Sequence, residues 1–125
     1  MFAPGDVVFF WSDGAGKPKF HICVALNGGF FYLNSPKART HPGDFVFSCS
    51  ELPFLKPTAN GSSIISCNTV LRLSPQKLKK FRAEKKGEMN AGLIAGLIGF
   101  VEATPVLTDA EKEEIVDALV DRIRP

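Results

Sequence analysis

Cysteine, long apolar runs and net charge are all scarce in this sequence. The chain has only 3 cysteines among 125 residues, an odd number without the dense spacing of a secreted disulfide framework. No apolar run approaches the roughly 20 residues that a membrane-spanning helix needs. The N-terminus lacks the basic segment and apolar stretch of a signal peptide. We therefore expect a cytoplasmic protein that begins at Met1, has no membrane association and keeps Cys23 and Cys67 buried and unpaired.

The net charge of +2 is small, but the charges are unevenly distributed along the chain. Residues 1–87 hold 12 Lys and Arg against 5 Asp and Glu, whereas residues 88–125 hold 3 against 8. The balance is +7 in the first segment and −5 in the second. The first segment is the better candidate for binding an anion, although two ordinary solvated surfaces would give the same counts.

The pattern of apolar residues predicts strands in the first half of the chain. Five short runs, rich in β-branched and aromatic residues, are separated by Gly, Pro, Asn and Ser. Residues 12–18 and 27–29 have the composition of hairpin turns, and the pair Asn27-Gly28 favours positive φ. We expect the first three strands to form an antiparallel meander. The predicted strands are 5–11, 20–26, 29–34, 44–48 and 62–73.

From Ser74 the pattern becomes helical. Ser74 is a suitable N-cap with Pro75 at the first helical position, and a longer helix is expected to begin near Glu88. Thr108 and Glu111 have the spacing of a capping box for a last, amphipathic helix. The apolar stripe of that helix consists of Ile115, Val116, Leu119, Val120 and Ile123.

Strands followed by helices indicate an α+β fold with a single core. We expect one domain over residues 1–125, with a β-barrel in 1–73 and mainly helices in 74–125. A small curled antiparallel sheet that closes into a barrel would leave no edge strand exposed. The chain is too short for a second core of comparable size.

Several motifs follow one another in a characteristic order. The chain opens with "PGDVVFF", continues through a hairpin into "KFHICVAL", and carries "SSIISCNTVLRLSPQKL" at residues 62–78. The segment "KKGEMNAGLIAGLIGFVEA" follows. In this order the motifs resemble those of the MazF/PemK/Kid family of toxin endoribonucleases, over residues 4–103.

The resemblance implies a small SH3-like barrel, a homodimer and inhibition by a cognate antitoxin protein. It also implies metal-independent cleavage of single-stranded RNA through a 2′,3′-cyclic phosphate, with no cofactor. Such chemistry needs a proton acceptor, a proton donor and a cation beside the phosphorus, which Lys, Arg, His and Ser can supply. The apolar density of residues 89–101 separately suggests that the C-terminal helices contribute to a subunit contact.

The candidate site lies at the start of the second predicted strand. Typical members of the family have Arg-Pro immediately before this strand, whereas this chain has Phe20-His21 preceded by Lys19. Either the site is rebuilt around His21 or RNA cleavage has been lost.

His21 titrates near neutral pH, and Lys19 lies two residues away on the same strand face. Ser35 follows the neighbouring third strand, where the resemblance implies a Ser or Thr. We expect His21, Lys19 and Ser35 to form a catalytic site in a groove edged by the 12–18 loop. The cations expected to bind RNA phosphates are Lys17, Lys37 and Arg39.

Other interpretations of these side chains stay open. His21 could be a core histidine that donates to a backbone carbonyl, with solvated lysines around it. A metal could bind His21 with Cys23, or His41 with Cys49, although neither spacing resembles a zinc site. Cys23 could also be a nucleophile if His21 activated it.

The basic segment 77–86 could hold an RNA backbone with Phe81 stacking on a base, or it could be a solvated helix surface.

Two alternative functions follow from the same residues. A non-enzymatic binder on the same barrel, like the gyrase-poisoning CcdB toxins or an RNA-binding module, would keep a groove without turnover. A purely structural interaction module would show no basic groove.

Overall fold

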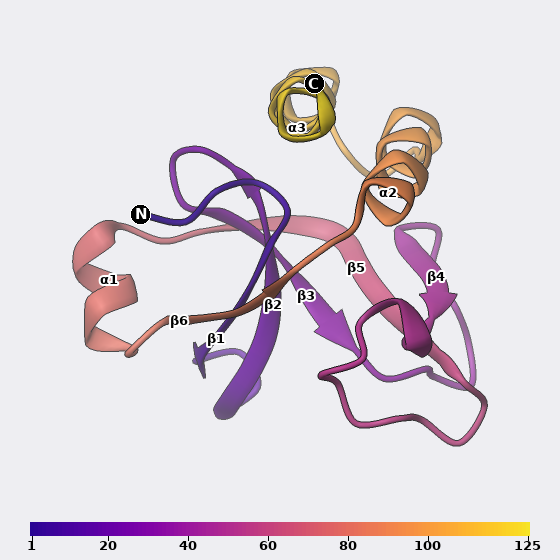
Figure 1. The fold of residues 1–125 in the computed structure, drawn as a ribbon, viewed down its shortest axis with the longest axis horizontal. Helices are drawn as coiled ribbons and strands as arrows, with labels where there is room; N and C mark the ends of the chain where they lie inside the picture. The colour runs from indigo at the N-terminus through magenta and orange to yellow at the C-terminus, as the bar shows by residue number, and fades with distance from the viewer.

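A computed structural model describes residues 1–125 of the chain. It has a six-stranded antiparallel sheet and three α-helices, and the fold is therefore α+β, as the sequence predicts (Figure 1). The strand order is β4-β5-β3-β2-β1-β6, and the sheet is not closed, since β4 and β6 lie at its two edges. The elements are β1 (Asp6–Ser12), β2 (Lys17–Ala25), β3 (Gly29–Asn34), β4 (Asp44–Ser48), the 3-10 turn η1 (Cys49–Glu51), β5 (Ser62–Arg72), α1 (Pro75–Lys80), β6 (Glu84–Glu88), α2 (Ala91–Ala103) and α3 (Asp109–Ile123).

The predicted meander of β1, β2 and β3 is confirmed, and its first hairpin is tighter than expected. The strand β2 begins at Lys17 rather than at Phe20, because Ser12 pairs with Lys17 across a turn of residues 13–16. Lys17 and Lys19 therefore belong to the sheet, where their neighbours are set by strand pairing and not by a mobile loop.

The strand β6 is absent from the sequence prediction, which places the start of a helix near Glu88. β6 pairs with β1 at the edge of the sheet, and its side chains are mostly exposed and charged. It therefore lacks the apolar alternation by which a strand is predicted. The helix α2 begins after β6, where the side chain of Asn90 accepts a hydrogen bond from the Leu93 amide at 2.8 Å.

The other two helix starts are confirmed. The Ser74 hydroxyl accepts a hydrogen bond from the Lys77 amide, with Pro75 in the first turn. Thr108 and Glu111 form the complete capping box, in which each side chain accepts a hydrogen bond from the other residue's amide. These contacts satisfy amide groups that have no partner within the helix.

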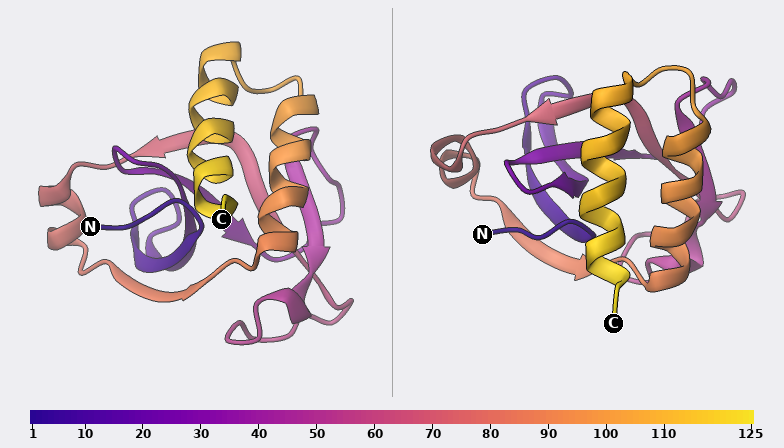
Figure 2. Two further views of the ribbon diagram at one scale, coloured as in Figure 1. Left: turned by 45° about the horizontal axis from the view of Figure 1, so that its top comes forward. Right: turned by 90° about the horizontal axis from the view of Figure 1, so that it is seen from above.

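Each face of the sheet carries an apolar cluster. The larger cluster has 18 buried residues and lies beneath α2 and α3, which pack side by side (Figures 1 and 2). The smaller cluster lies on the other face of the meander and includes Leu78 of α1. Cys23 and Cys67 are buried and unpaired, as predicted. The smaller cluster consists of Val8, Phe10, Cys23, Phe30 and Leu78.

The apolar residues of α2 are covered within one chain. Leu93, Ile94, Leu97 and Val101 are buried against the sheet and α3, and the exposed apolar positions of the helix are alanine and glycine. The large apolar side chains on which the expected subunit contact depended are thus already packed. None of the helices has the length and apolar character needed to cross a membrane.

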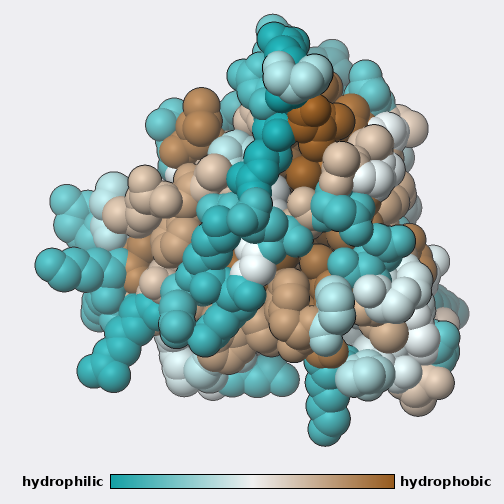
Figure 3. All heavy atoms as spheres, viewed as in Figure 1, coloured by the Kyte–Doolittle hydropathy of each residue, from teal (hydrophilic) through white to brown (hydrophobic).

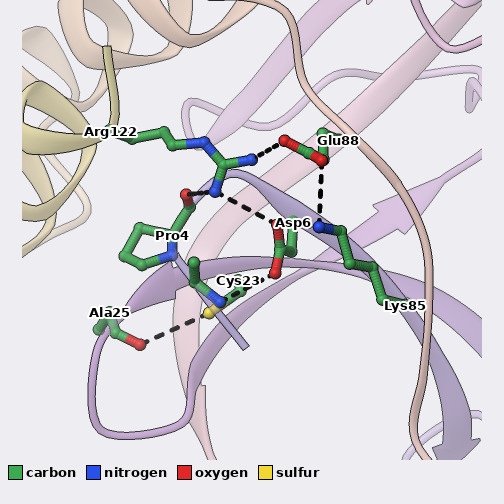
Figure 4. A network of polar contacts seen from close by, with 8 residues as sticks. Pro4, Asp6, Cys23, Ala25, Lys85, Glu88 and Arg122 are labelled. Atoms are coloured by element: carbon green, nitrogen blue, oxygen red, sulfur yellow. Dashed lines mark hydrogen bonds and ion pairs between the residues drawn. The ribbon is translucent and has the colours of Figure 1, made fainter. Parts of the chain in front are cut away.

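A polar network ties the C-terminal helix to the first strand (Figure 4). The guanidinium of Arg122 donates to the carbonyl of Pro4 at 3.0 Å, to the carboxylate of Asp6 at 3.2 Å, and to Glu88. Lys85 lies 3.4 Å from Asp6 and 3.1 Å from Glu88. Asp6 is only 3% exposed, and these two cations, together with the Ala3 amide that donates to it at 2.9 Å, replace the water that its carboxylate loses on burial.

Candidate nucleic-acid interface

Lys19 lies at the centre of a polar patch on β2, β3 and the loop that follows β3. Its ammonium group donates a hydrogen bond to Oδ1 of Asn34 and lies 5.3 Å from the centre of the Tyr32 ring, a cation–π contact. Burial, followed by the nearby charges of Lys17 and Lys37, lowers the pKa of Lys19. These five residues, Lys17, Lys19, Tyr32, Asn34 and Lys37, are called the Lys19 patch below.

The cations of the Lys19 patch have no acidic partner. Neither Lys17, Lys19 nor Lys37 forms an ion pair, and the ion pairs of the protein lie elsewhere. Lys17 and Lys37 are exposed, and Lys19 is half-buried. Like charges that lower the pKa of Lys19 repel one another, and a bound anion would remove this repulsion. The patch is therefore suited to a negatively charged ligand.

His21 lies beneath this patch and has no exposed surface. Its ring stacks on Phe10, with centroids 3.7 Å apart and 8° between the planes. Nδ1 lies 3.0 Å from the carbonyl oxygen of Lys19, whereas Nε2 has no hydrogen-bond partner. Burial lowers the pKa of His21 to about 4, so the imidazole is neutral at pH 7. His21 thus does not line an open groove, contrary to expectation, and the core-histidine interpretation matches this geometry.

Ser35 lies on the opposite face of the sheet from His21. It is exposed and lines a hollow with Phe20 and Leu33, both of which pack against the larger apolar cluster. Successive side chains of a strand point to opposite faces, so Asn34 rather than Ser35 meets Lys19. The structure therefore brings Lys19 and His21 together as predicted, but it does not bring Ser35 to them.

The three predicted phosphate ligands differ in their positions. Lys17 and Lys37 adjoin Lys19 closely enough to lower its pKa. Arg39 is exposed and forms no ion pair, and no contact links it to the patch.

Sequence reasoning missed Tyr32 and Asn34. Tyr32 pairs with His21 across the β2–β3 hairpin, and its hydroxyl lies close to Gly14 in the first turn, since a Cβ on Gly14 would be 3.3 Å from it. The turn at Asn27-Gly28 predicts the pairing of β2 with β3 but not its register. The register shifts between Cys23 and Ala25, and this shift places Tyr32 opposite His21, with Asn34 on the same face as Tyr32.

The buried thiols are not activated. Burial raises the pKa of Cys23 to about 11 and the pKa of Cys67 to about 12. Both thiols are protonated at neutral pH, and a protonated thiol is a poor nucleophile and metal ligand. No group of three or more His, Cys, Asp and Glu side chains is arranged to hold a metal ion.

Comparisons with protein-family models, curated proteins and solved structures found no match to this chain. Function is therefore inferred from the charges, rings and burial of the residues described above.

Proposed function

We propose that this chain binds single-stranded RNA through the Lys19 patch. The observation that carries the proposal is the convergence of Lys17, Lys19 and Lys37 without a carboxylate partner. Burial, followed by the charges of Lys17 and Lys37, lowers the pKa of Lys19. RNA phosphates supply the missing negative charge, and binding releases counterions. Tyr32 adds an aromatic ring and Asn34 an amide beside that charge, the two side-chain types that read unpaired bases.

The order of the sequence motifs supports RNA as the ligand, because the MazF/PemK/Kid family that they resemble acts on single-stranded RNA. The SH3-like barrel, the homodimer and the cognate antitoxin belong to the same proposal. The α+β class and the antiparallel pairing of the strands support this proposal, whereas the six-stranded sheet itself is open.

Cleavage of the bound RNA is a second candidate function. The lowered pKa of Lys19 favours it, because an ammonium group that releases its proton more readily is a better donor to the departing 5′ oxygen. His21 does not supply this proton, since it is buried and neutral. An endoribonuclease built on this site would use Lys19 beside the scissile phosphate.

Fluorescence anisotropy of an end-labelled oligoribonucleotide of about 12 nucleotides tests the binding proposal. We expect Lys19→Gln to weaken binding roughly tenfold at low salt and to reduce the slope of log affinity against log salt by about 1. Lys112→Gln is the matched control, because Lys112 lies on α3 and contacts the carbonyl of Glu102. Equal effects of the two substitutions would contradict the assignment of the patch.

The same oligonucleotide, incubated with EDTA and separated on a denaturing gel, tests the second candidate. Cleavage that leaves a 2′,3′-cyclic phosphate and is lost in Lys19→Gln supports an endoribonuclease. If the RNA is bound but remains intact, the result contradicts the endoribonuclease and supports a non-enzymatic RNA binder.

A further inference from the structure

A cleft separates the β1–β2 hairpin from α1 and the residues that follow it. Its volume is about 570 Å³, within the range of sites that hold small organic ligands. Trp11 and Phe81 are aromatic residues of its lining, and three cations, Lys77, Lys80 and Arg82, line it as well. Figure 3 shows hydrophilic side chains extending from the α1 end of the molecule beside apolar ones.

Trp11 is the only tryptophan of the chain, and 41% of it is exposed. Its Nε1 donates a hydrogen bond to Asp13 at 3.0 Å, which holds the ring in one orientation. This bond also engages the one acidic side chain in the lining of the cleft. An exposed, oriented indole is a stacking surface for a planar ligand.

The cations of the cleft are unpaired with any acid. Neither Lys77, Lys80 nor Arg82 forms an ion pair, in contrast to the neighbouring Lys85 and Lys86. Lys77 lies 5.4 Å from the centre of the Phe81 ring. Arg82 has a φ of 53°, the one positive value outside glycine, so the chain turns sharply here at an energetic cost.

We propose that this cleft is a nucleotide-binding subsite, in which a base stacks on Trp11 and a phosphate contacts Lys80 and Arg82. The inference rests on the proposed function, because single-stranded RNA is the ligand of both sites. Pro18 lines the cleft and lies between Lys17 and Lys19 in β2. Because side chains alternate along β2, Pro18 faces the opposite side of the strand from Lys17 and Lys19, and a strand of RNA that occupies both sites passes around the β1–β2 hairpin.

RNA fits the lining better than an acidic peptide does. Three cations would attract either ligand, but two aromatic side chains beside them match a ligand that carries a planar ring next to each charge. Nucleotides have this alternation of base and phosphate, whereas a chain of Asp or Glu side chains has the charge alone.

The fluorescence of Trp11 reports directly on this subsite, because no other tryptophan contributes. We expect an oligoribonucleotide to quench the emission as its base stacks on the indole. Inorganic polyphosphate of matched charge tests whether charge alone is sufficient, and we expect it to leave the emission nearly unchanged. Quenching by polyphosphate or by poly-glutamate to the same extent as by RNA would overturn the inference.

Lys80 and Lys79 provide a matched pair of variants. Both are exposed residues of the last turn of α1, but Lys80 lines the cleft and Lys79 lines a neighbouring hollow with Met1 and Phe2. We expect Lys80→Gln to raise the RNA concentration needed for half-maximal quenching roughly fivefold to tenfold, and Lys79→Gln less than twofold. Equal effects of the two would overturn the inference.

The two proposals fail in distinguishable ways. Binding seen by anisotropy without quenching of Trp11 overturns the subsite and leaves the Lys19 patch intact. Quenching that needs more RNA in Lys80→Gln but is unchanged in Lys19→Gln supports the subsite and contradicts the patch. Absence of both signals with RNA overturns both proposals.

Discussion

At the scale of single residues, the surroundings of His21 decide what this side chain can do. Its ring packs in the core as an aromatic side chain would: it stacks on Phe10 and lies edge-on to Phe30. Because protonation would leave a charge in an apolar cluster, the neutral form is stabilised. Lys19, two residues earlier on the same face, keeps its ammonium group at the surface, where a ligand can reach it.

We predict that the fold loses stability as the pH falls from about 6.5 to about 4. His21 has an ordinary pKa of 6.5 in the unfolded chain and a pKa of about 4 in the fold. The unfolded state therefore binds more protons in this window, so the contribution is fully present above pH 6.5 and is lost as the pH falls towards 4. A shift of this size corresponds to about 3 kcal/mol. Urea unfolding at a series of pH values measures it.

The variant His21→Phe provides the control for this prediction. A phenyl ring preserves the stack on Phe10 but does not titrate, so the free energy of unfolding should vary less with pH between about 4 and 6.5. The exposed His41 is unchanged in both proteins. Identical pH dependence in the two proteins would show that His21 is not the group responsible.

At the scale of the elements, the turns and helix ends are specified by residues close together in the sequence. The turn between β2 and β3 contains Gly28 with a φ of 75°, and the turn between β1 and β2 contains Gly16 with a φ of 66°. They differ in their environment. A Cβ on Gly28 would lie 2.1 Å from the carbonyl oxygen of Leu73, whereas a Cβ on Gly16 would meet nothing within 4 Å.

This difference predicts unequal costs for the same substitution. Gly16→Ala should destabilise the fold by about 1 kcal/mol, the cost of a left-handed conformation. Gly28→Ala should cost at least about 1 kcal/mol more, because the Leu73 main chain must also move. Chemical unfolding of both variants measures the difference. Equal losses would mean that the β2–β3 turn can shift away from Leu73.

The capping box of α3 leads to a second prediction for the elements. Thr108→Ala removes the oxygen that accepts from the Glu111 amide and should lower the free energy of unfolding by about 1 kcal/mol. Thr108→Ser keeps that oxygen and should remain within about 0.5 kcal/mol of the wild type. A loss of similar size in both variants would point to the methyl group of Thr108 rather than to its hydrogen bond.

At the scale of the whole molecule, Arg122 joins the end of the chain to its beginning. It contacts Pro4, Asp6 and Glu88, so α3 is connected to both β1 and β6. The larger apolar cluster holds the same helix through Ile115 and Leu119. Apolar packing therefore holds α3 against the sheet, and the polar contacts of Arg122 fix the orientation of this helix.

We predict that Arg122→Met destabilises the protein by about 2 kcal/mol, because the buried Asp6 carboxylate then keeps Lys85 as its one cationic partner, beside the amide of Ala3. Asp6→Asn removes the charge instead. In the double variant the losses should not add, with a coupling of at least about 1 kcal/mol between Arg122 and Asp6. A double-mutant cycle by urea unfolding measures it, and simple additivity would contradict the role given to this ion pair.

The candidate site was predictable in part. Alternation along β2 correctly placed Lys19 and His21 on one face, and the excess of cations in residues 1–87 pointed to the segment that holds the unpaired Lys17, Lys19 and Lys37. The error at Ser35 was one of register. A displacement by one residue along β3 moves a side chain to the other face of the sheet, and Asn34 rather than Ser35 adjoins Lys19 as a result.

The sequence by itself determined the features whose partners lie within a few residues: the caps at Ser74 and Thr108, the turn at Asn27-Gly28 and the periodicity that separates strands from helices. Only the tertiary structure decided the burial of His21, because Phe10 and Phe30, which enclose it, come from two other strands. It likewise decided β6, since an exposed, charged segment becomes a strand only when β1 offers its unpaired edge.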